Sequence, residues 1–486
     1  MKQQLLSASV WQPAQDLQEH LNSTSIININ AHKKSLSQGT KRKILSKLRD
    51  IYRAHLKQHL IIRTAVRWSW YIGYPLYQRY ILVTLDYFRD SKQRKWRNLI
   101  KLSDFVEATG LSKRVLEPAE KTPYFQPVVT PLQARVCLQS DEQRDFFPEV
   151  VITIIPSALV YGGTNFISVG EDIVCHDLFD WLRDTTSEEL HQRAWIKPSA
   201  KRIRWMKNDE FPAAVPTGAI FTDACATNYA HWMSEVLPRI ALFCAQDNYE
   251  HIPIIVDAGL HQNIMDSLLL VTGLERKIIT LPVNRALKVD QLYATSVAGY
   301  VPFGQRKRPL FEFYKKQLTG HSQGIFSAKA LSIMRDNIIG NEKQNTPDNT
   351  LPSKIFLRRR TGTRCLVNSD EVESFFVGQG FSLVEPETLT FLQQRELFRH
   401  AKIIASPTGA ALANALLCQP KTQVIVLMAK HEDMIYRYWA NMLSPLNIVV
   451  SYVLGEISNH RDLGIHGDFS VAINDLKNLL ETLGEK

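Results

Sequence analysis

The sequence predicts an α/β protein with two Rossmann-like, doubly wound domains that face a cleft, preceded by a basic helical extension. Two observations predict the domains: β-branched runs alternate with helical segments from about residue 125 onward, and one polar run divides this alternation. The chain has 486 residues, 45% of them hydrophobic, which is enough to bury two ordinary cores and leave a further segment. An uneven charge distribution marks that segment as the extension.

The first predicted domain spans residues 125–340. A β-branched run at 150–156 and the segment 251–259 are typical of strands, a helix follows, and 277–281 is typical of the next strand. Strand, helix and strand in this order indicate a parallel sheet. The polar run 341–353 then predicts a linker between the domains.

The second predicted domain spans residues 354–486, where strands and helices alternate strictly. The expected strands are 354–360, 381–386, 401–407 and 422–429, and the expected helices are 369–380, 391–400 and 411–418. Two doubly wound units joined by a linker place their strand ends, and therefore their binding sites, around a shared crevice.

The N-terminal part differs from both domains. Residues 1–40 are polar and weakly patterned, which predicts a poorly ordered tail, and residues 41–124 are predicted to form a basic amphipathic helical extension. From Lys41 to Lys101 there are 16 Lys and Arg against three acids, a net charge of +13 in a chain whose total is +10. Apolar residues recur in it at helical spacing: Ile44, Leu45, Leu48, Ile51, Tyr52 and Leu56.

Several interpretations of this basic, aromatic segment stay open. One is contact with an anionic membrane surface through residues 41–101. The others are a pair of solvated helices packed on the main body, or an oligomerisation arm. Nucleic-acid binding is disfavoured because no recognised nucleic-acid module surrounds the segment.

Missing patterns exclude several classes of protein. The six cysteines form no CxxC pair, no stretch of 18 or more apolar residues occurs, and the N-terminus does not resemble a signal peptide. We therefore expect a cytoplasmic protein, peripheral at the inner face of the membrane if the extension binds lipid. DxD, HExxH, GxSxG and GxGxxG are also absent, so we expect no metal site and no cofactor, and neither a serine hydrolase nor an NAD-dependent dehydrogenase.

The densest polar cluster in an apolar context lies at residues 228–239. A helix that begins after Asn228 and stops near Pro238 places His231 and Glu235 four residues apart on one face. A carboxylate beside an imidazole raises its basicity, as the removal of a proton from a sugar hydroxyl requires. The same spacing also fits a buried structural network, and spacing alone does not separate the two.

Basic residues and a glycine follow two expected strands of the second domain. Arg358, Arg359, Arg360 and Arg364 come after the first strand, where they can meet a donor diphosphate or form a solvated basic loop. The segment 406–414 lies between a strand and a helix, so its backbone N–H groups face an anion at the helix N-terminus.

With these residues the sequence resembles glycosyltransferase family 61, over roughly residues 150–450. The most specific block is 228–239, which is similar to the family's Asn-aromatic-x-His-Trp-x-x-Asp/Glu-x-x-Pro-Arg. Two further blocks occur in the right order: one contains Arg359, Arg364, Asn368 and Glu371, and the other is Pro407–Asn414.

The resemblance implies a GT-B fold, inverting transfer, and a nucleotide-sugar donor held mainly by the C-terminal domain. It implies that His231 or Glu235 is the general base, that Arg359 and Arg364 neutralise the leaving diphosphate, and that the loop of Gly409 supports the nucleotide. The donor-binding residues that it implies are Asn228, Arg359, Arg364, Asn368, Thr408, Gly409, Ala410 and Asn414.

The sequence departs from the family pattern at three positions. Arg358 stands where Ser is usual, Thr408 replaces a His, and Val426 occupies a strand position that often carries Glu. The last two lie near the expected donor site, so the identity of the donor stays open.

We therefore expect an inverting hexosyl- or pentosyltransferase of polysaccharide or capsule assembly, acting on a glycan or lipid-linked glycan acceptor. The alternative is a non-catalytic, membrane-associated binding protein that keeps the fold. A nucleotide-sugar epimerase is disfavoured because its dinucleotide fingerprint is missing.

Overall fold

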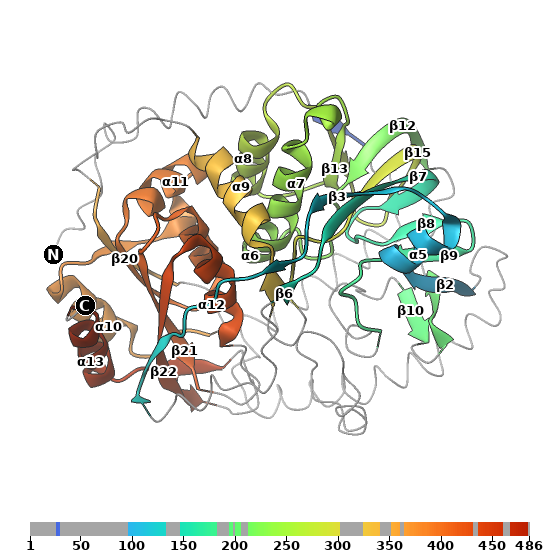
Figure 1. The fold of residues 1–486 in the computed structure, drawn as a ribbon. Coiled ribbons are helices and arrows are strands. Elements are labelled where there is room, and N and C mark those ends of the chain that lie inside the picture. The colour runs from blue at the N-terminus through green and yellow to red at the C-terminus, as the bar shows by residue number, and fades with distance from the viewer. Residues whose placement is uncertain are drawn as a thin grey trace, which may run out of the picture.

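The computed structural model is an α/β protein (Figure 1). It describes residues 26–29, 96–132, 146–181, 194–197, 200–205, 212–301, 324–340, 351–359, 364–430, 436–459 and 467–484.

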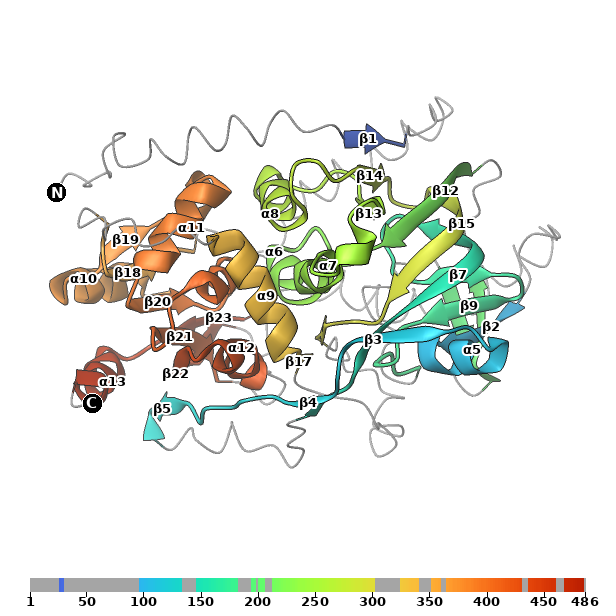
Figure 2. The same ribbon diagram turned by 45° about the horizontal axis from the view of Figure 1, so that its top comes forward.

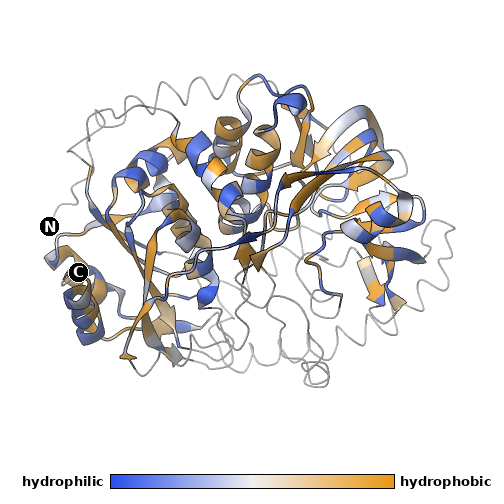
Figure 3. Cartoon of the chain, in the orientation of Figure 1, coloured by the Kyte–Doolittle hydropathy of each residue, from blue (hydrophilic) through white to orange (hydrophobic). Residues whose placement is uncertain are grey.

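The described residues form two large sheets, with helices α7 and α9 lying between them (Figure 1). The first sheet has 12 strands in the described part of the chain, and the second has seven. Apolar residues concentrate on the strands of both sheets, whereas the helices carry apolar and polar faces (Figure 3). This pattern is that of layers that bury their sheets under amphipathic helices.

Parallel strands make up one part of the first sheet. Their order is β1–β14–β13–β12–β15, and helices α7 and α8 connect β12 to β13 and β13 to β14. The chain moves outward from β12 and then returns to its other side with β15, so the topological switch point lies between β12 and β15. These elements are β1 (Ile26–Asn28), β12 (Ala213–Ile220), α7 (Leu237–Cys244), β13 (Ile254–Asp257), α8 (Gln262–Thr272), β14 (Ile278–Leu281) and β15 (Ala286–Thr295).

The rest of the first sheet is mixed, which corrects the expectation of a doubly wound first domain. Its long strand β7 pairs antiparallel with β15, and β8 and β9 follow as hairpin strands. Short turns between them leave no room for the crossover helix that parallel pairing requires. The elements are α5 (Leu102–Thr109), β2 (Trp96–Lys101), β3 (Lys113–Glu117), β7 (Val150–Tyr161), β8 (Ile167–Val169), β9 (Asp172–Cys175), β10 (Ala194–Lys197) and β11 (Arg202–Trp205).

The second sheet is doubly wound, as predicted. Its parallel strands have the order β19–β18–β20–β21–β22, with β23 antiparallel at the end. The order reverses at β18, so the switch point lies between β18 and β20. The elements are β18 (Lys354–Leu357), α10 (Ser369–Gly378), β19 (Ser382–Val384), α11 (Phe391–His400), β20 (Ile403–Pro407), the 3₁₀-helix η12 (Ala410–Leu417), β21 (Gln423–Ala429), α12 (Arg437–Leu443), β22 (Val449–Asn459), β23 (Asp468–Ser470) and α13 (Ile473–Gly484).

Some segments join sheets or strands that the sequence analysis did not assign to them. Strand β5 (Val128–Thr130), within the predicted first domain, pairs with β22 of the second sheet (Figure 2). Strand β22 is longer than its neighbours, and β5 covers the edge that it would otherwise leave unpaired. Strand β1 lies in the predicted tail and pairs with β14.

The predicted helical extension of residues 41–124 lies outside the described residues up to position 95. From Trp96 onward the structure differs from the prediction, because β2 and β3 form strands and only α5 is helical. Pairing of β2 with β9 and of β3 with β7 overrides the local helical pattern there. Among the described helices, none is long and apolar enough to cross a membrane.

Smaller elements complete the described chain. They are β4 (Glu120–Lys121), β6 (Phe146–Phe147), α6 (Tyr229–His231), the π-helix η8 (Trp232–Val236), η9 (Asp247–Tyr249), β16 (Gly299–Tyr300), β17 (Ile325–Phe326), α9 (Ala328–Ile339), η11 (Pro386–Thr388) and η13 (Ser444–Leu446).

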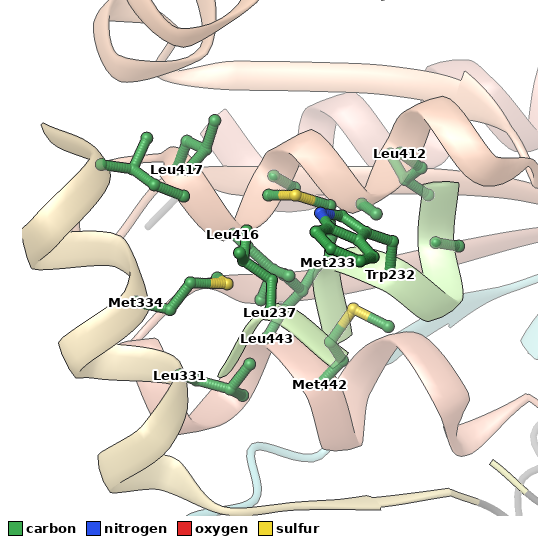
Figure 4. Packing of buried hydrophobic residues seen from close by; sticks show 14 of the residues in the cluster. Trp232, Met233, Leu237, Leu331, Met334, Leu412, Leu416, Leu417, Met442 and Leu443 are labelled. Carbon is green, nitrogen blue, oxygen red and sulfur yellow. The ribbon is translucent and has the colours of Figure 1, made fainter. Parts of the chain in front are cut away.

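The two sheets share one apolar core. We call the part of the chain that contains the first sheet the first half, and the part that contains the second sheet the second half. Trp232, Met233 and Leu237 of the first half pack against η12, α12 and α9 (Figure 4). All three side chains are buried, and the Trp232 indole N–H donates to Ser267 Oγ at 2.9 Å. Burial of this apolar surface stabilises the contact between the halves as it stabilises a domain interior. The labelled partners in Figure 4 are Leu331, Met334, Leu412, Leu416, Leu417, Met442 and Leu443.

Leu416→Ala tests this shared core. Leu416 is fully buried, so we expect the free energy of unfolding to fall by about 2–5 kcal/mol. Tryptophan fluorescence and circular dichroism should both report a single denaturant transition, in which the two halves unfold together. Leu383→Ala is the control because Leu383 is 37% exposed, and its cost should be within about 0.5 kcal/mol. Two separate transitions in the wild type would contradict a common core.

Candidate active site

A helical segment after β12 carries the predicted His–Glu pair. It starts at Asn228, whose side-chain oxygen accepts a hydrogen bond from Ala230 N at 3.1 Å. The segment does not stop near Pro238 as predicted, because it continues through a π-helix into α7, and Pro238 lies in the first turn of α7. Between α6 and α7, residues 232–236 form a π-helix, a local distortion that is frequent at functional sites.

His231 and Glu235 are in direct contact. His231 Nδ1 lies 2.5 Å from Glu235 Oε1, and each side chain is 13% exposed. The other carboxylate oxygen, Oε2, accepts a hydrogen bond from Val301 N at 3.3 Å. Since an ionised carboxylate only accepts, this contact assigns the imidazole proton to Nδ1. The tautomer that results uses Nε2 for proton transfer.

Burial controls the ionisation of this pair. Removal from solvent raises the pKa of Glu235 above its ordinary value of 4.5, and the contact with His231 opposes this rise. Arg239, on α7, is 5% exposed and lies close enough for the charges of Asp223, Glu235 and Asp257 to act on it. Its guanidinium also stacks on the ring of Phe221, with 5.2 Å between Cζ and the ring centroid.

A glycine after β15 brings the backbone up to Glu235. A Cβ added at Gly299 would lie 2.3 Å from the carbonyl oxygen of Ser234. Strand β16 therefore approaches the π-helix more closely than a residue with a side chain would permit. This approach brings Val301 N within hydrogen-bonding distance of Glu235 Oε2. The sequence analysis missed Gly299 and Val301, because nothing near them in the chain indicates this contact.

A second carboxylate orders the loop before the His–Glu helix. Asp257 is the last residue of β13 and is buried, and its Oδ2 accepts from Asp223 N at 2.8 Å. It also accepts a hydrogen bond from Gly163 N. Asp223 in turn accepts from Cys225 N at 2.9 Å. The loops at the carboxyl ends of β7, β12 and β13 are thereby held together, which fixes the start of the helix.

The predicted arginines have different environments. Arg358 forms ion pairs with Glu373 at 2.8 Å and Glu385 at 2.9 Å. Because these carboxylates compensate its charge, Arg358 stabilises the second half and is not a ligand-binding residue. Arg359 Nη1 donates to Thr408 O at 3.1 Å. Arg360 lies outside the described residues.

Of the three predicted arginines that the structure describes, Arg364 has the least compensated charge. Its backbone is left-handed with φ +56, which is uncommon for a residue with a side chain. Its buried Nε has no hydrogen-bond partner within the part of the chain that the structure describes. Burial lowers the pKa of Arg364, and the nearby charge of Arg359 lowers it further. Both guanidinium groups remain protonated at neutral pH, so the two positive charges together attract an anion.

Gly409 makes room for Arg359. An added Cβ at Gly409 would lie 2.1 Å from Arg359 Nη1, so the guanidinium lies directly over the backbone of this loop. Thr408 is buried, and its hydroxyl accepts a hydrogen bond from Trp439 Nε1 at 3.1 Å. Arg359 and Gly409 therefore lie together at the carboxyl ends of β18 and β20, with Thr408 beneath them.

The other predicted donor-binding residues bind parts of the protein. Asn368 holds Val471 through a bond from Nδ2 to Val471 O at 2.8 Å. Asn414 is fully buried; its Oδ1 accepts from the Tyr229 hydroxyl at 2.5 Å, and its Nδ2 donates to Gln394 at 2.6 Å. Asn228 is the helix cap described above, and Ala410 begins η12. The Tyr229–Asn414 bond links the two halves beside the shared core.

Both clusters lie at switch points. The loop after β12 leads into His231 and Glu235, and the chain after β15 supplies Val301; these strands flank the switch point of the first sheet. Arg359 and Gly409 follow β18 and β20, which flank the switch point of the second. Ligands of open α/β sheets bind at such points.

Tyr438, on α12, connects the two clusters. Its ring lies edge-on to Phe326, with 6.1 Å between centroids, and its hydroxyl lies beside Ser234, within electrostatic range of Glu235 and Arg364. Burial raises the pKa of Tyr438, and the charge of Glu235 raises it further. The sequence analysis missed Tyr438, since a tyrosine in an apolar helix gives no signal of its own.

Across the described ranges of the chain, no group of three or more His, Cys, Asp or Glu side chains gathers as ligands for a metal ion.

The model of one protein family matches part of this chain. The family is described as Glycosyltransferase 61, and the match covers residues 229–425. It includes His231, Glu235, Arg359, Arg364 and Gly409 and ends before Tyr438. No curated protein matches the chain. The match supports a glycosyltransferase.

Gly409→Ala tests the arginine site. The added methyl group collides with the far end of a flexible side chain, so we expect the free energy of unfolding to change by less than about 1 kcal/mol while Arg359 is displaced. Affinity for inorganic pyrophosphate, measured by calorimetry, should fall about tenfold. Gly378→Ala is the matched control, because an added Cβ there meets nothing within 4 Å. Equal affinities in wild type and Gly409→Ala would show that Arg359 does not bind the anion.

Glu235→Gln tests the buried carboxylate. Because the pKa of Glu235 is raised, the folded protein binds this proton more tightly than the unfolded chain does. The stability linked to this proton is present below about pH 4.5 and is lost as the pH rises through the folded pKa. The Tm of Glu235→Gln relative to wild type should therefore increase between pH 4.5 and 8. Glu171→Gln, at an exposed site, is the control, and a Tm difference that declines with pH would contradict the raised pKa.

Proposed function

We propose that this protein is an inverting glycosyltransferase that moves a sugar from a nucleotide-sugar donor to a glycan acceptor. The observation that supports the proposal is that Glu235 of a proton-accepting pair and Arg364 of an arginine pair both lie within electrostatic range of Tyr438. Glycosyl transfer needs both: a base for the acceptor hydroxyl and positive charge for the departing diphosphate.

On the acceptor side, we propose His231 as the general base. Glu235 holds Nδ1 and stabilises the imidazolium that forms, and Nε2 takes the proton from the acceptor hydroxyl. The acceptor oxygen then bonds to the anomeric carbon of the donor sugar. This assignment leaves Glu235 as the orienting group and His231 as the residue that touches substrate.

The inverting outcome is supported by the bonds of Glu235. Its Oε1 is held by His231 and its Oε2 by Val301 N, so neither oxygen is placed to attack an anomeric carbon. A single displacement, in which the acceptor attacks opposite the leaving group, requires no such nucleophile.

On the donor side, we propose that Arg359 and Arg364 bind the diphosphate. The bond from the anomeric carbon to the phosphate oxygen breaks, and its electron pair leaves with the nucleoside diphosphate. Two guanidinium groups at a switch point supply charge for this step, so the proposed reaction needs no divalent ion.

Further parts of the proposal rest on the resemblance to the family. We propose a GT-B arrangement, transfer of a hexosyl or pentosyl group, and a role in polysaccharide or capsule assembly on the cytoplasmic side. Contact of residues 41–101 with an anionic membrane surface would bring the enzyme to a lipid-linked acceptor.

A two-step experiment tests the function. Thermal-shift screening against UDP-, GDP-, CMP- and dTDP-sugars should give a selective rise in Tm that EDTA does not remove, because a ligand of the native state raises apparent stability. With that donor, His231→Ala should lower kcat at least about 100-fold, since it removes the base.

The control for His231→Ala is His251→Ala, at an exposed position far from the pair in sequence. A folded His231→Ala protein with near-normal turnover would remove His231 from the role of base. No shift with any nucleotide sugar would favour the non-catalytic alternative.

A further inference from the structure

Tyr438 occupies a place that neither the His–Glu pair nor the arginine pair explains. Of residues 436–440, it is the one that is not buried. Its neighbours are anchored: the Tyr436 hydroxyl donates to Ala429 O at 2.9 Å, and Arg437 stacks on Tyr124 with 4.1 Å to the ring centroid. Trp439 bonds to Thr408. The backbone of Tyr438 is thus held on both sides, and its side chain is partly buried against the core.

The ring of Tyr438 is packed in place. It lies edge-on to Phe326, with 6.1 Å between centroids, and 4.6 Å from the ring of Trp439. Its Cδ2 would lie 3.5 Å from a Cβ added at Gly324, so that glycine forms part of the same wall. A ring fixed by such contacts holds its hydroxyl at one position with little loss of entropy.

The hydroxyl of Tyr438 points to the boundary between the two clusters. Ser234 lies beside this hydroxyl, and because Ser234 Oγ donates to Ala230 O at 2.8 Å, Ser234 can only accept from the phenol of Tyr438. Glu235 and Arg364 lie close enough for both charges to act on the same hydroxyl. The phenol proton is therefore available beside Arg364 once an anion displaces Ser234 as its acceptor.

We propose that Tyr438 is a catalytic residue that donates a hydrogen bond to the leaving diphosphate, together with Arg364. The inference rests on the proposed function. As the bond from the anomeric carbon to phosphate breaks, negative charge gathers on the phosphate oxygen, and the phenol stabilises it without giving up its proton. Burial that raises the pKa of Tyr438 keeps the phenol protonated and so able to donate.

The position of Tyr438 suits the diphosphate and not the nucleoside. Arg359 and Gly409 lie at the carboxyl ends of β18 and β20, whereas the hydroxyl of Tyr438 lies within electrostatic range of both Arg364 and Glu235 of the other half. A donor that spans the two clusters places its sugar-bearing phosphate nearest to Tyr438. Loss of the hydroxyl should therefore affect binding of a diphosphate far more than binding of a monophosphate.

Tyr438→Phe removes the hydroxyl and keeps the ring contacts. We expect the affinity for the nucleoside diphosphate of the preferred base, measured by calorimetry, to fall about tenfold, because a hydrogen bond to a charged group is lost. Affinity for the matching monophosphate should stay within twofold. With the donor identified by thermal shift, kcat should fall more than KM rises.

Two variants separate this role from a structural one. Tyr249→Phe removes another tyrosine hydroxyl in the first half, next to Phe243, and should leave both affinities unchanged. Ser234→Ala removes the resting partner of Tyr438 and should not reproduce the loss of diphosphate affinity. If Ser234→Ala matches Tyr438→Phe, the hydroxyl only supports the π-helix, and the inference fails.

The outcomes also separate this inference from the proposed function. Wild-type protein that binds a nucleoside diphosphate, together with Tyr438→Phe protein of equal affinity and kcat, overturns the role of Tyr438 alone. Wild-type protein that binds none of the UDP, GDP, CMP and dTDP probes overturns the proposed function, and the inference with it.

Discussion

Packing of the helical segment 229–244 against the second half is the constraint on which the rest of the structure depends. One face of this segment carries Trp232, Met233 and Leu237 into the shared apolar core, where η12 and α12 meet it. The opposite face carries His231 and Glu235. Because both faces belong to one helix, the burial that joins the halves also sets the distance from the His–Glu pair to the arginines. The Tyr229–Asn414 hydrogen bond joins the two halves at the same contact.

The positive charges of the arginines in the candidate site are not all compensated by nearby carboxylates. Arg358 forms ion pairs with two glutamates, whereas the like charge of Arg359 acts on Arg364. Both arginines keep a buried Nε without a hydrogen-bond partner among the described residues. Such an arrangement costs stability in the absence of a ligand and is relieved by an anion. Arg364 also has a left-handed backbone, which costs energy for a residue with a side chain. The surrounding apolar core supplies the stability that offsets these costs.

Prediction from the sequence succeeded where local patterns decide the structure. The alternation of strands and helices after residue 354 is regular, and the second sheet has the doubly wound order expected from it. In the first half, the predicted unit of strand, helix and strand over residues 251–281 is confirmed, with parallel pairing of β13 and β14. The prediction of a doubly wound first domain was wrong, because short turns after β7 produce antiparallel hairpins in place of crossovers. Pairing with distant strands likewise decided β1, β2 and β5. A strand of three residues has too little pattern to indicate its partner across 250 residues of chain.

The sequence by itself determined the chemistry of the candidate site: a histidine four residues from a glutamate on one helical face, and arginines and a glycine after consecutive strands. Spacing within one helix, or next to a strand end, is a local property, so residues close in the chain reveal it. Only the tertiary structure decided which of these groups act together. Asn414 is buried between the halves, and Arg358 forms ion pairs with two glutamates. Val301 and Tyr438 lie close to Glu235. These contacts join residues far apart in the chain, and they form because burial of a common apolar core forces the segments together.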